Sequence, residues 1–155
     1  MTRLPIAKER IDEYSSHPKV KSCGAVVFHK FGSEIKYIII KTHEKFGDNW
    51  DFPKGNNEDG ESETDTANRE IHEEVGLNVK LIDNFREEVH YLVKNGQILK
   101  TTVYFLGEST GIHVKLDPRE VEAYEWLNYD KALEKLTYEQ SKEVLKNANE
   151  FLKDY

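Results

Sequence analysis

The chain has 155 residues, the length of one domain, and its 37% hydrophobic and 33% charged residues are ordinary for a globular protein. The net charge of −7 argues against a broad surface for extended nucleic acid, but it allows an anionic substrate held by a metal and a few lysines. The only cysteine, Cys23, excludes an intrachain disulfide, and the lack of a ~18-residue apolar run or a signal-peptide core predicts a cytoplasmic protein without a membrane span.

The first predicted elements are a polar N-terminal extension over residues 1–20 and the start of the main domain, expected over residues 21–155. Within the extension, ERIDEY is compatible with a short helix. Apolar runs rich in β-branched and aromatic residues predict strands over Lys21–His29 and Glu34–Lys41. Proline, glycine, asparagine and aspartate then predict an irregular loop over residues 44–61.

A helix is predicted directly after this loop. Ser62 or Thr64 can cap its first free N–H groups. Gly76 suits the left-handed residue that often follows the last helical turn. Its buried face is expected to consist of apolar residues at every fourth position: Ala67, Ile71 and Val75.

The rest of the chain predicts a hairpin followed by helices. Asn95-Gly96 is typical of a two-residue type I′ turn, which places Tyr91 opposite Lys100 on the paired strand. The strand–helix–strand order with a later hairpin predicts an α/β sandwich with a mixed sheet. The strands are expected over Leu81–Arg86, Glu88–Lys94, Gln97–Leu106, Ile112–Leu116 and Ala123–Leu127, and the helices over residues 129–136 and 138–155.

Three glutamates of the predicted helix carry the first chemical signal. Glu70, Glu73 and Glu74 are spaced at i, i+3 and i+4, so they share one helix face and repel one another. Arg69 is expected to point elsewhere on the helix, which makes a divalent cation such as Mg²⁺ or Mn²⁺ the natural counter-charge. A solvated acidic face fits the same spacing.

The residues around these glutamates favour the metal. Gly55, Glu61, Arg69-Glu70, Glu73-Glu74 and Gly76, with apolar residues at 71 and 77, resemble the Nudix box. The resemblance implies a Nudix-type α/β/α sandwich that hydrolyses a nucleoside diphosphate linked to another group with Mg²⁺ or Mn²⁺. It also implies that Glu70, Glu73 and Glu74 bind metal and activate water, and that the structural supports are Gly55, Glu61, Arg69 and Gly76.

Two further segments are candidates for substrate binding. Lys54 lies in WDFPKG, next to the acidic loop, where it could meet a phosphate oxygen or be an ordinary surface lysine. Hairpin register places Tyr91, Lys100 and Tyr104 on one sheet face. Such a face could hold a base by stacking and a phosphate by charge, or it could simply be solvated.

A narrower resemblance extends from about Lys21 to the C-terminus. CGAVVF, W-x-F-P-K-G, the Nudix box, F-x-E-x-x-Y, K-x-x-V-Y-F-L and E-x-x-A-Y-x-W-L are similar to the asymmetric diadenosine tetraphosphate hydrolases of the Nudix family. The products implied are ATP and AMP. The resemblance implies phosphate contacts by Lys54 and Lys100, with Lys54 also catalytic, a tyrosine near the phosphates at Tyr104, an adenine between Tyr91 and Tyr138, and a further metal ligand at Glu120.

Several alternatives stay open at this point. On sequence alone Glu120 reads as a surface acid, and Asn49 and residues 56–60 depart from the pattern of this group. The enzyme alternative is an RNA 5′-pyrophosphohydrolase or another Nudix nucleoside-polyphosphate pyrophosphatase. A binding module that senses a nucleotide without hydrolysing it is a third reading. The identity of the general base and the oligomeric state are not decided by the sequence.

Overall fold

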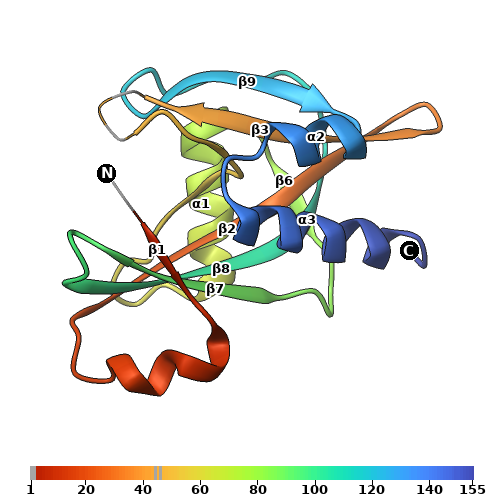
Figure 1. Cartoon of the computed structure of the whole chain (residues 1–155). Helices are drawn as coiled ribbons and strands as arrows, with labels where there is room; N and C mark the ends of the chain where they lie inside the picture. Colours follow the sequence, from red (N-terminus) through yellow and green to blue (C-terminus); the bar gives the residue numbers. More distant parts are fainter. Residues whose placement is uncertain (1–2, 44, 46) are drawn as a thin grey trace.

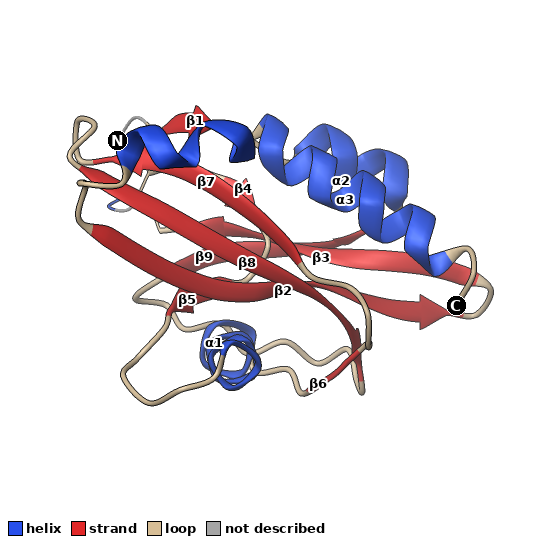
Figure 2. Cartoon of the chain, turned by 90° about the horizontal axis from the view of Figure 1, so that it is seen from below, coloured by secondary structure: helices blue, strands red, loops and turns tan. Residues whose placement is uncertain are grey.

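The computed structural model describes residues 3–43, 45 and 47–155 as one mixed sheet with helices on both faces (Figures 1 and 2). Helix α1 covers one face, and α2, α3 and the 3₁₀ helix η1 lie on the other (Figure 2). The elements are β1 (Leu4–Ile6), η1 (Lys8–Tyr14), β2 (Lys19–Phe31), β3 (Glu34–Thr42), β4 (Trp50–Asp51), β5 (Lys54–Asn56), α1 (Glu63–Val75), β6 (Val79–Leu81), β7 (Glu87–Val93), β8 (Ile98–Ser109), β9 (Val121–Leu127), α2 (Tyr129–Lys135) and α3 (Glu139–Leu152). This architecture confirms the predicted α/β sandwich.

The sheet has the order β1-β7-β8-β2-β3-β4, with β5, β6 and β9 pairing to β2, β8 and β3 respectively. Strands β2 and β8 run parallel, and the other pairs are antiparallel. The hairpin register is as predicted, because Tyr91 pairs with Lys100 and Glu87 with Tyr104. Asn95 and Gly96 have φ values of 57° and 83°, the positive signs that a type I′ turn requires.

Side-chain alternation along the central strands builds two apolar cores. Val26 and Phe28 of β2 pack towards α2 and α3, whereas Ala25 and Val27 pack towards α1. The α1 side of the second core consists of Ala67, Ile71 and Val75, all fully buried as predicted. Both faces of β2 are therefore covered, which explains its nearly continuous apolar sequence.

Three predicted elements differ from the structure. The loop over residues 44–61 contains the short strands β4 and β5; Glu44 and Phe46 in it lie outside the described residues. The strand expected over Leu81–Arg86 lies instead at Val79–Leu81, and the residues after it turn at Asn84, which has a φ of 73°. Residues 112–116 form no strand, since backbone groups of this segment bond to the end of α1: Lys115 N–H donates to Val75 O at 2.9 Å.

The N-terminal extension joins the sheet. Leu4–Ile6, for which no strand was predicted, pairs with Leu92, Tyr91 and His90 of β7 as β1. The ERIDEY segment lies in η1. In the described part of the chain, no helix combines the length and apolar character needed to cross a membrane.

Candidate active site

Helix α1 begins and ends where its sequence predicts. The hydroxyl of Ser62 accepts a hydrogen bond from Asp65 N–H at 3.1 Å and caps the N-terminus. Gly76 has a φ of 72°, and its N–H donates to His72 O at 2.9 Å, closing the C-terminus. The helix is thus fixed at both ends, and its buried apolar face sets the direction in which its glutamates point.

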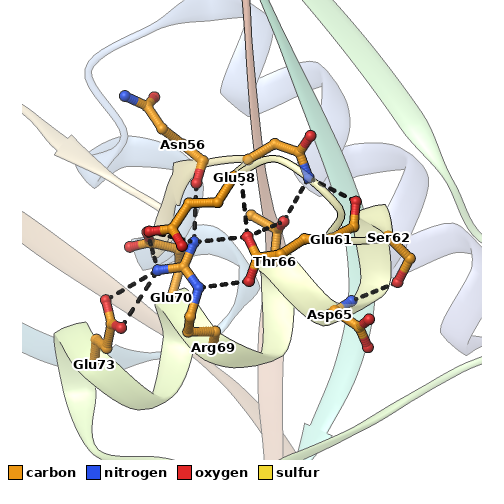
Figure 3. Close-up of polar contacts among 10 residues, drawn as sticks. Asn56, Glu58, Glu61, Ser62, Asp65, Thr66, Arg69, Glu70 and Glu73 are labelled. Carbon is orange, nitrogen blue, oxygen red and sulfur yellow. Dashed lines mark hydrogen bonds and ion pairs between the residues drawn. The ribbon is translucent and has the colours of Figure 1, made fainter.

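Arg69 ties the preceding loop to this helix (Figure 3). Its guanidinium donates to both carboxylate oxygens of Glu61, at 2.7 and 2.9 Å, and to the backbone oxygen of Asn56 at 3.0 Å. It also donates to Glu70 at 2.8 Å and to Glu73 at 3.2 Å. The prediction that Arg69 points away from the glutamates is therefore wrong: the arginine side chain is long enough to turn back along the helix. Its hydrogen bonds lower the pKa of Glu61 to about 2.

Gly55 lies so close to Glu70 that no side chain fits between them. A Cβ atom built on Gly55 would lie 2.0 Å from Cδ and Oε2 of Glu70. Strand β5 holds the glycine in place by pairing it with Cys23 of β2. A glycine at this position is required for the Glu70 carboxylate to lie against the strand.

Three carboxylates converge between α1, β5 and the segment before β9. Oxygens of Glu70, Glu74 and Glu120 lie within 4.8 Å of one another. Glu74 accepts a hydrogen bond from Lys54 N–H at 2.9 Å. The backbone oxygen of Glu120 accepts one from His43 N–H at 2.8 Å. The structure thus brings together residues far apart in sequence, including Glu120, which is exposed, as composition and spacing suggested, and still joins the cluster.

Burial and mutual repulsion make the negative charge of this cluster unfavourable unless a cation is bound. Glu70 and Glu74 are each 8% exposed. Burial raises the pKa of Glu74 to about 8, and the negative charges of Glu70 and Glu120 act in the same direction. Burial also raises the pKa of Glu70. Closely spaced carboxylate oxygens are the donors that Mg²⁺ and Mn²⁺ prefer, so the cluster fits a hard divalent cation.

Glu73 lies apart from the other three predicted metal ligands. Its side chain is 51% exposed, and its carboxylate pairs with Arg69. A ligand role for Glu73 stays a prediction, whereas its observed contact is with the arginine that holds the loop.

A cavity of about 320 Å³ adjoins the carboxylate cluster. Its lining includes Lys54, Tyr91, Lys100 and Tyr138, the predicted contacts to phosphate and base, together with Arg3. A neighbouring cavity is lined by the three clustered glutamates. Thr42, Lys54 and Lys100 line both cavities, so a ligand in the first can extend to the carboxylates.

Lys54 and Lys100 place positive charge in the region that the two cavities share. Burial lowers the pKa of Lys100, and the neighbouring charge of Lys54 lowers it further. Burial also opposes the charge on Lys54, but Tyr91 and Asp51 outweigh it and raise its pKa. An anionic ligand would offset the repulsion between the two lysines.

Tyr104 is placed differently from the other predicted substrate residues. It is fully buried, and its ring packs edge-to-face on Phe52 at 5.3 Å. Its hydroxyl donates to Asp51 at 3.5 Å, and Ser141 donates to the same carboxylate at 2.8 Å. Tyr104 therefore supports the floor beneath the cavity, and the structure does not bring its hydroxyl to the cavity lining.

Arg3 is the site residue that sequence reasoning missed. Its guanidinium carbon lies 3.8 Å from the ring centre of Tyr91 and 3.6 Å from that of Tyr138. The same group lies 3.9 Å from Asp51 and donates to Gln140 at 3.3 Å. No sequence pattern identifies Arg3, because the long-range contacts of a single arginine in a polar terminal segment cannot be predicted from its neighbours in the sequence.

Comparison with known proteins identifies the family. Residues 19–148 match the NUDIX domain, so the chain belongs to the Nudix family. A bis(5′-nucleosyl)-tetraphosphatase [asymmetrical] of Sus scrofa is 31% identical over 144 residues, 86% of this chain and 95% of that protein. An RNA pyrophosphohydrolase of a Sulfurovum species is 28% identical over 117 residues, 68% of this chain and 74% of that protein.

The fold is also that of a solved relative. A binary complex of the C. elegans Ap4A hydrolase superimposes with a TM-score of 0.80 at 23% identity, covering 88% of this chain and 99% of that one. The chain is thus a Nudix pyrophosphohydrolase in its fold and its family.

Proposed function

We propose that this protein hydrolyses diadenosine tetraphosphate asymmetrically to ATP and AMP, with Mg²⁺ or Mn²⁺ as cofactor. The observation that carries the proposal is the junction of two cavities, one lined by three glutamates and the other by two tyrosines, with Lys54 and Lys100 shared by both. A nucleotide whose base lies at the tyrosines would direct its phosphate chain past the lysines to the carboxylates. The similarity to the Sus scrofa tetraphosphatase supports the same substrate class.

Each group of residues has a distinct proposed role in the reaction. Glu70, Glu74 and Glu120 would hold a divalent cation, which supplies charge neutralisation at the phosphates and a water of lowered pKa. Lys54 and Lys100 would stabilise negative charge on the phosphate chain. Arg69 and Glu61 keep the loop and the Glu70 carboxylate in place through the hydrogen bonds described above. Glu74, nearly buried and bonded to Lys54 N–H, is suited to accept a proton from the attacking water.

An RNA 5′-pyrophosphohydrolase is the second candidate, supported by similarity to the Sulfurovum enzyme. A triphosphorylated 5′ end would use the same glutamates and lysines, and it needs few further contacts. The similarity to the tetraphosphatase covers 86% of this chain and that to the RNA pyrophosphohydrolase 68%, which favours the dinucleotide. A nucleotide sensor without activity would have no use for a carboxylate cluster of this density.

Product analysis tests the proposal directly. The purified chain is incubated with Mg²⁺ and either diadenosine tetraphosphate or a short 5′-triphosphorylated RNA, in water labelled with ¹⁸O. We expect ATP and AMP from the first substrate, with the label in one product identifying the phosphorus attacked. Cleavage of the RNA with the dinucleotide untouched would overturn the choice of substrate. Tight nucleotide binding without any product would identify a sensor.

A further inference from the structure

The N-terminal segment occupies the slot between the two tyrosines of the cavity. The guanidinium of Arg3 lies over both rings, with its carbon 3.8 Å from the centre of Tyr91 and 3.6 Å from that of Tyr138. Both separations match the roughly 3.5–4.0 Å of carbon–carbon van der Waals contact. The slot is therefore one planar group wide, and that group is already present.

Several contacts stabilise the Arg3 side chain in the slot between the two tyrosines. Its side chain is only 8% exposed, so its charge interacts with the ring faces at low solvent exposure. Gln140 accepts a hydrogen bond from it at 3.3 Å, and Asp51 lies 3.9 Å away. The other oxygen of Asp51 accepts hydrogen bonds from Phe52 N–H and from Ser141, and these two donors remain when Arg3 leaves.

Arg3 directly precedes the short edge strand β1. β1 has three residues, and it forms the edge of the sheet beside β7. Pro5, its middle residue, has no N–H and is of the type that sheets tolerate at an edge. Leu4 is 49% exposed, and only Ile6 is buried, in a small cluster with Leu92 and Leu99. Release of this short edge would free Arg3 without opening either main core.

We infer that Arg3 is an intramolecular occupant of the base slot, which a purine base of the substrate must displace before it can stack between Tyr91 and Tyr138. The inference rests on the proposed function for the identity of the base. A purine and a guanidinium are both planar and both stack on aromatic faces, so they compete for the same space. Arg3 thereby weakens binding of base-containing ligands and leaves binding at the phosphate sites to the lysines.

Binding to the full-length chain distinguishes competition from direct recognition. Dissociation constants are measured in EDTA for diadenosine tetraphosphate and for inorganic tripolyphosphate, which has no base. In Arg3→Ala we expect the dinucleotide to bind about tenfold more tightly, and tripolyphosphate to bind no more tightly than to the parent chain. Arg3→Lys, which keeps the charge but lacks the plane, should also bind the dinucleotide more tightly.

Arg10→Ala is the matched control, because Arg10 belongs to the same N-terminal segment but its exposed guanidinium pairs with the exposed Glu13. It should bind both ligands as the parent chain does. A dinucleotide affinity that is unchanged or weaker in Arg3→Ala would overturn the inference, since Arg3 would then be irrelevant to the slot or would itself hold substrate.

The outcome is separable from that of the proposed function. In Arg3→Ala the KM for diadenosine tetraphosphate, measured with Mg²⁺, should decrease together with the Kd for the same ligand. If the parent chain makes no ATP and AMP, the proposed function fails. Tighter dinucleotide binding by the variant would still support the occupied slot. The Tm of each variant is measured as well, to show that the substitutions have not unfolded the sheet.

Discussion

Replacing Gly55 by alanine should weaken cation binding and lower activity while leaving the fold nearly as stable. A Cβ atom at residue 55 would lie 2.0 Å from Cδ and Oε2 of Glu70. These atoms are the far end of a flexible side chain, so the clash is relieved when the carboxylate rotates away. The folded state then loses the ion pair in which Arg69 donates to Glu70 at 2.8 Å.

The two consequences differ in size. A partly exposed ion pair contributes at most about 1 kcal/mol to the free energy of unfolding. For a chain of this length that corresponds to a fall in Tm of about 3 °C. The cation site, by contrast, loses one of its three clustered carboxylates. We expect Kd for Mn²⁺ to rise at least about tenfold and kcat/KM to fall about 100-fold, as for other disturbed ligand shells.

Two other glycines provide matched controls. At Gly24 a Cβ would lie 2.1 Å from the backbone oxygen of Pro53, which cannot rotate away. Gly24→Ala should therefore cost about 1–3 kcal/mol of stability. Nothing lies within 4 Å of a Cβ at Gly111, and its φ is not in the left-handed region. Gly111→Ala should retain Mn²⁺ affinity and should gain up to about 1 kcal/mol, because the unfolded chain loses freedom.

The assays are thermal denaturation by circular dichroism, Mn²⁺ titration by electron paramagnetic resonance, and turnover of diadenosine tetraphosphate. Parent-like Mn²⁺ affinity and turnover in Gly55→Ala would refute the reasoning, since the Glu70 carboxylate would not need its place beside β5. A fall in Tm as large as that of Gly24→Ala would show that the backbone, and not Glu70, gives way.

Three further substitutions test separate parts of the site and the loop. Glu74→Gln keeps an oxygen for the hydrogen bond from Lys54 N–H but loses the charge, so kcat should fall about 10²–10⁴-fold with Tm unchanged or higher; near-normal turnover would exclude Glu74 as a catalytic group. Tyr138→Ala removes one stacking face, so KM for diadenosine tetraphosphate should rise about tenfold while tripolyphosphate affinity stays constant; an unchanged KM would place the base elsewhere. Glu63→Gln tests pH dependence: hydrogen bonds from Arg86 and, less strongly, Lys21 lower the pKa of Glu63 to about 2. The stabilisation is then complete above the ordinary pKa of about 4.5 and is lost as pH falls towards 2. Because both partners are partly solvated, urea titrations should show Glu63→Gln less stable by about 1 kcal/mol at pH 7, a difference that shrinks as pH falls through 4.5 and vanishes below about 2; a difference that does not shrink in acid would contradict this account.

The sequence predicted those parts of the site that depend on residues close together in the chain. The cap at Ser62, the left-handed Gly76 and the apolar face of α1 are all decided within a few residues of chain. The hairpin register followed from Asn95-Gly96, because a two-residue turn leaves only one pairing of the flanking strands. These signals were sufficient to place Tyr91 opposite Lys100.

The features that the sequence did not predict depend on contacts between residues far apart in the chain. The apolar residues of 112–116 are compatible with a strand, but their backbone bonds to the last turn of α1, and that docking leads the chain to Glu120. Likewise, the direction of Arg69 depends on where the loop presents Glu61 and the Asn56 carbonyl. Helical spacing alone places the Cβ of an arginine and says little about its guanidinium.

The face that carries Tyr91 shows how burial changes the meaning of a correct register. Alternation alone allowed this face to be an ordinary solvated one, yet Tyr91 is 2% exposed and Val89 is 7% exposed, beneath α3. Covering by the C-terminal helix turns the polar residues of that face into a lined cavity, and the N-terminal strand adds Arg3 to it. The family resemblance begins near Lys21 and the NUDIX match begins at residue 19. Arg3 therefore lies before the residues that carry the domain match. A change at such a terminal residue can alter ligand selection without touching the clustered carboxylates.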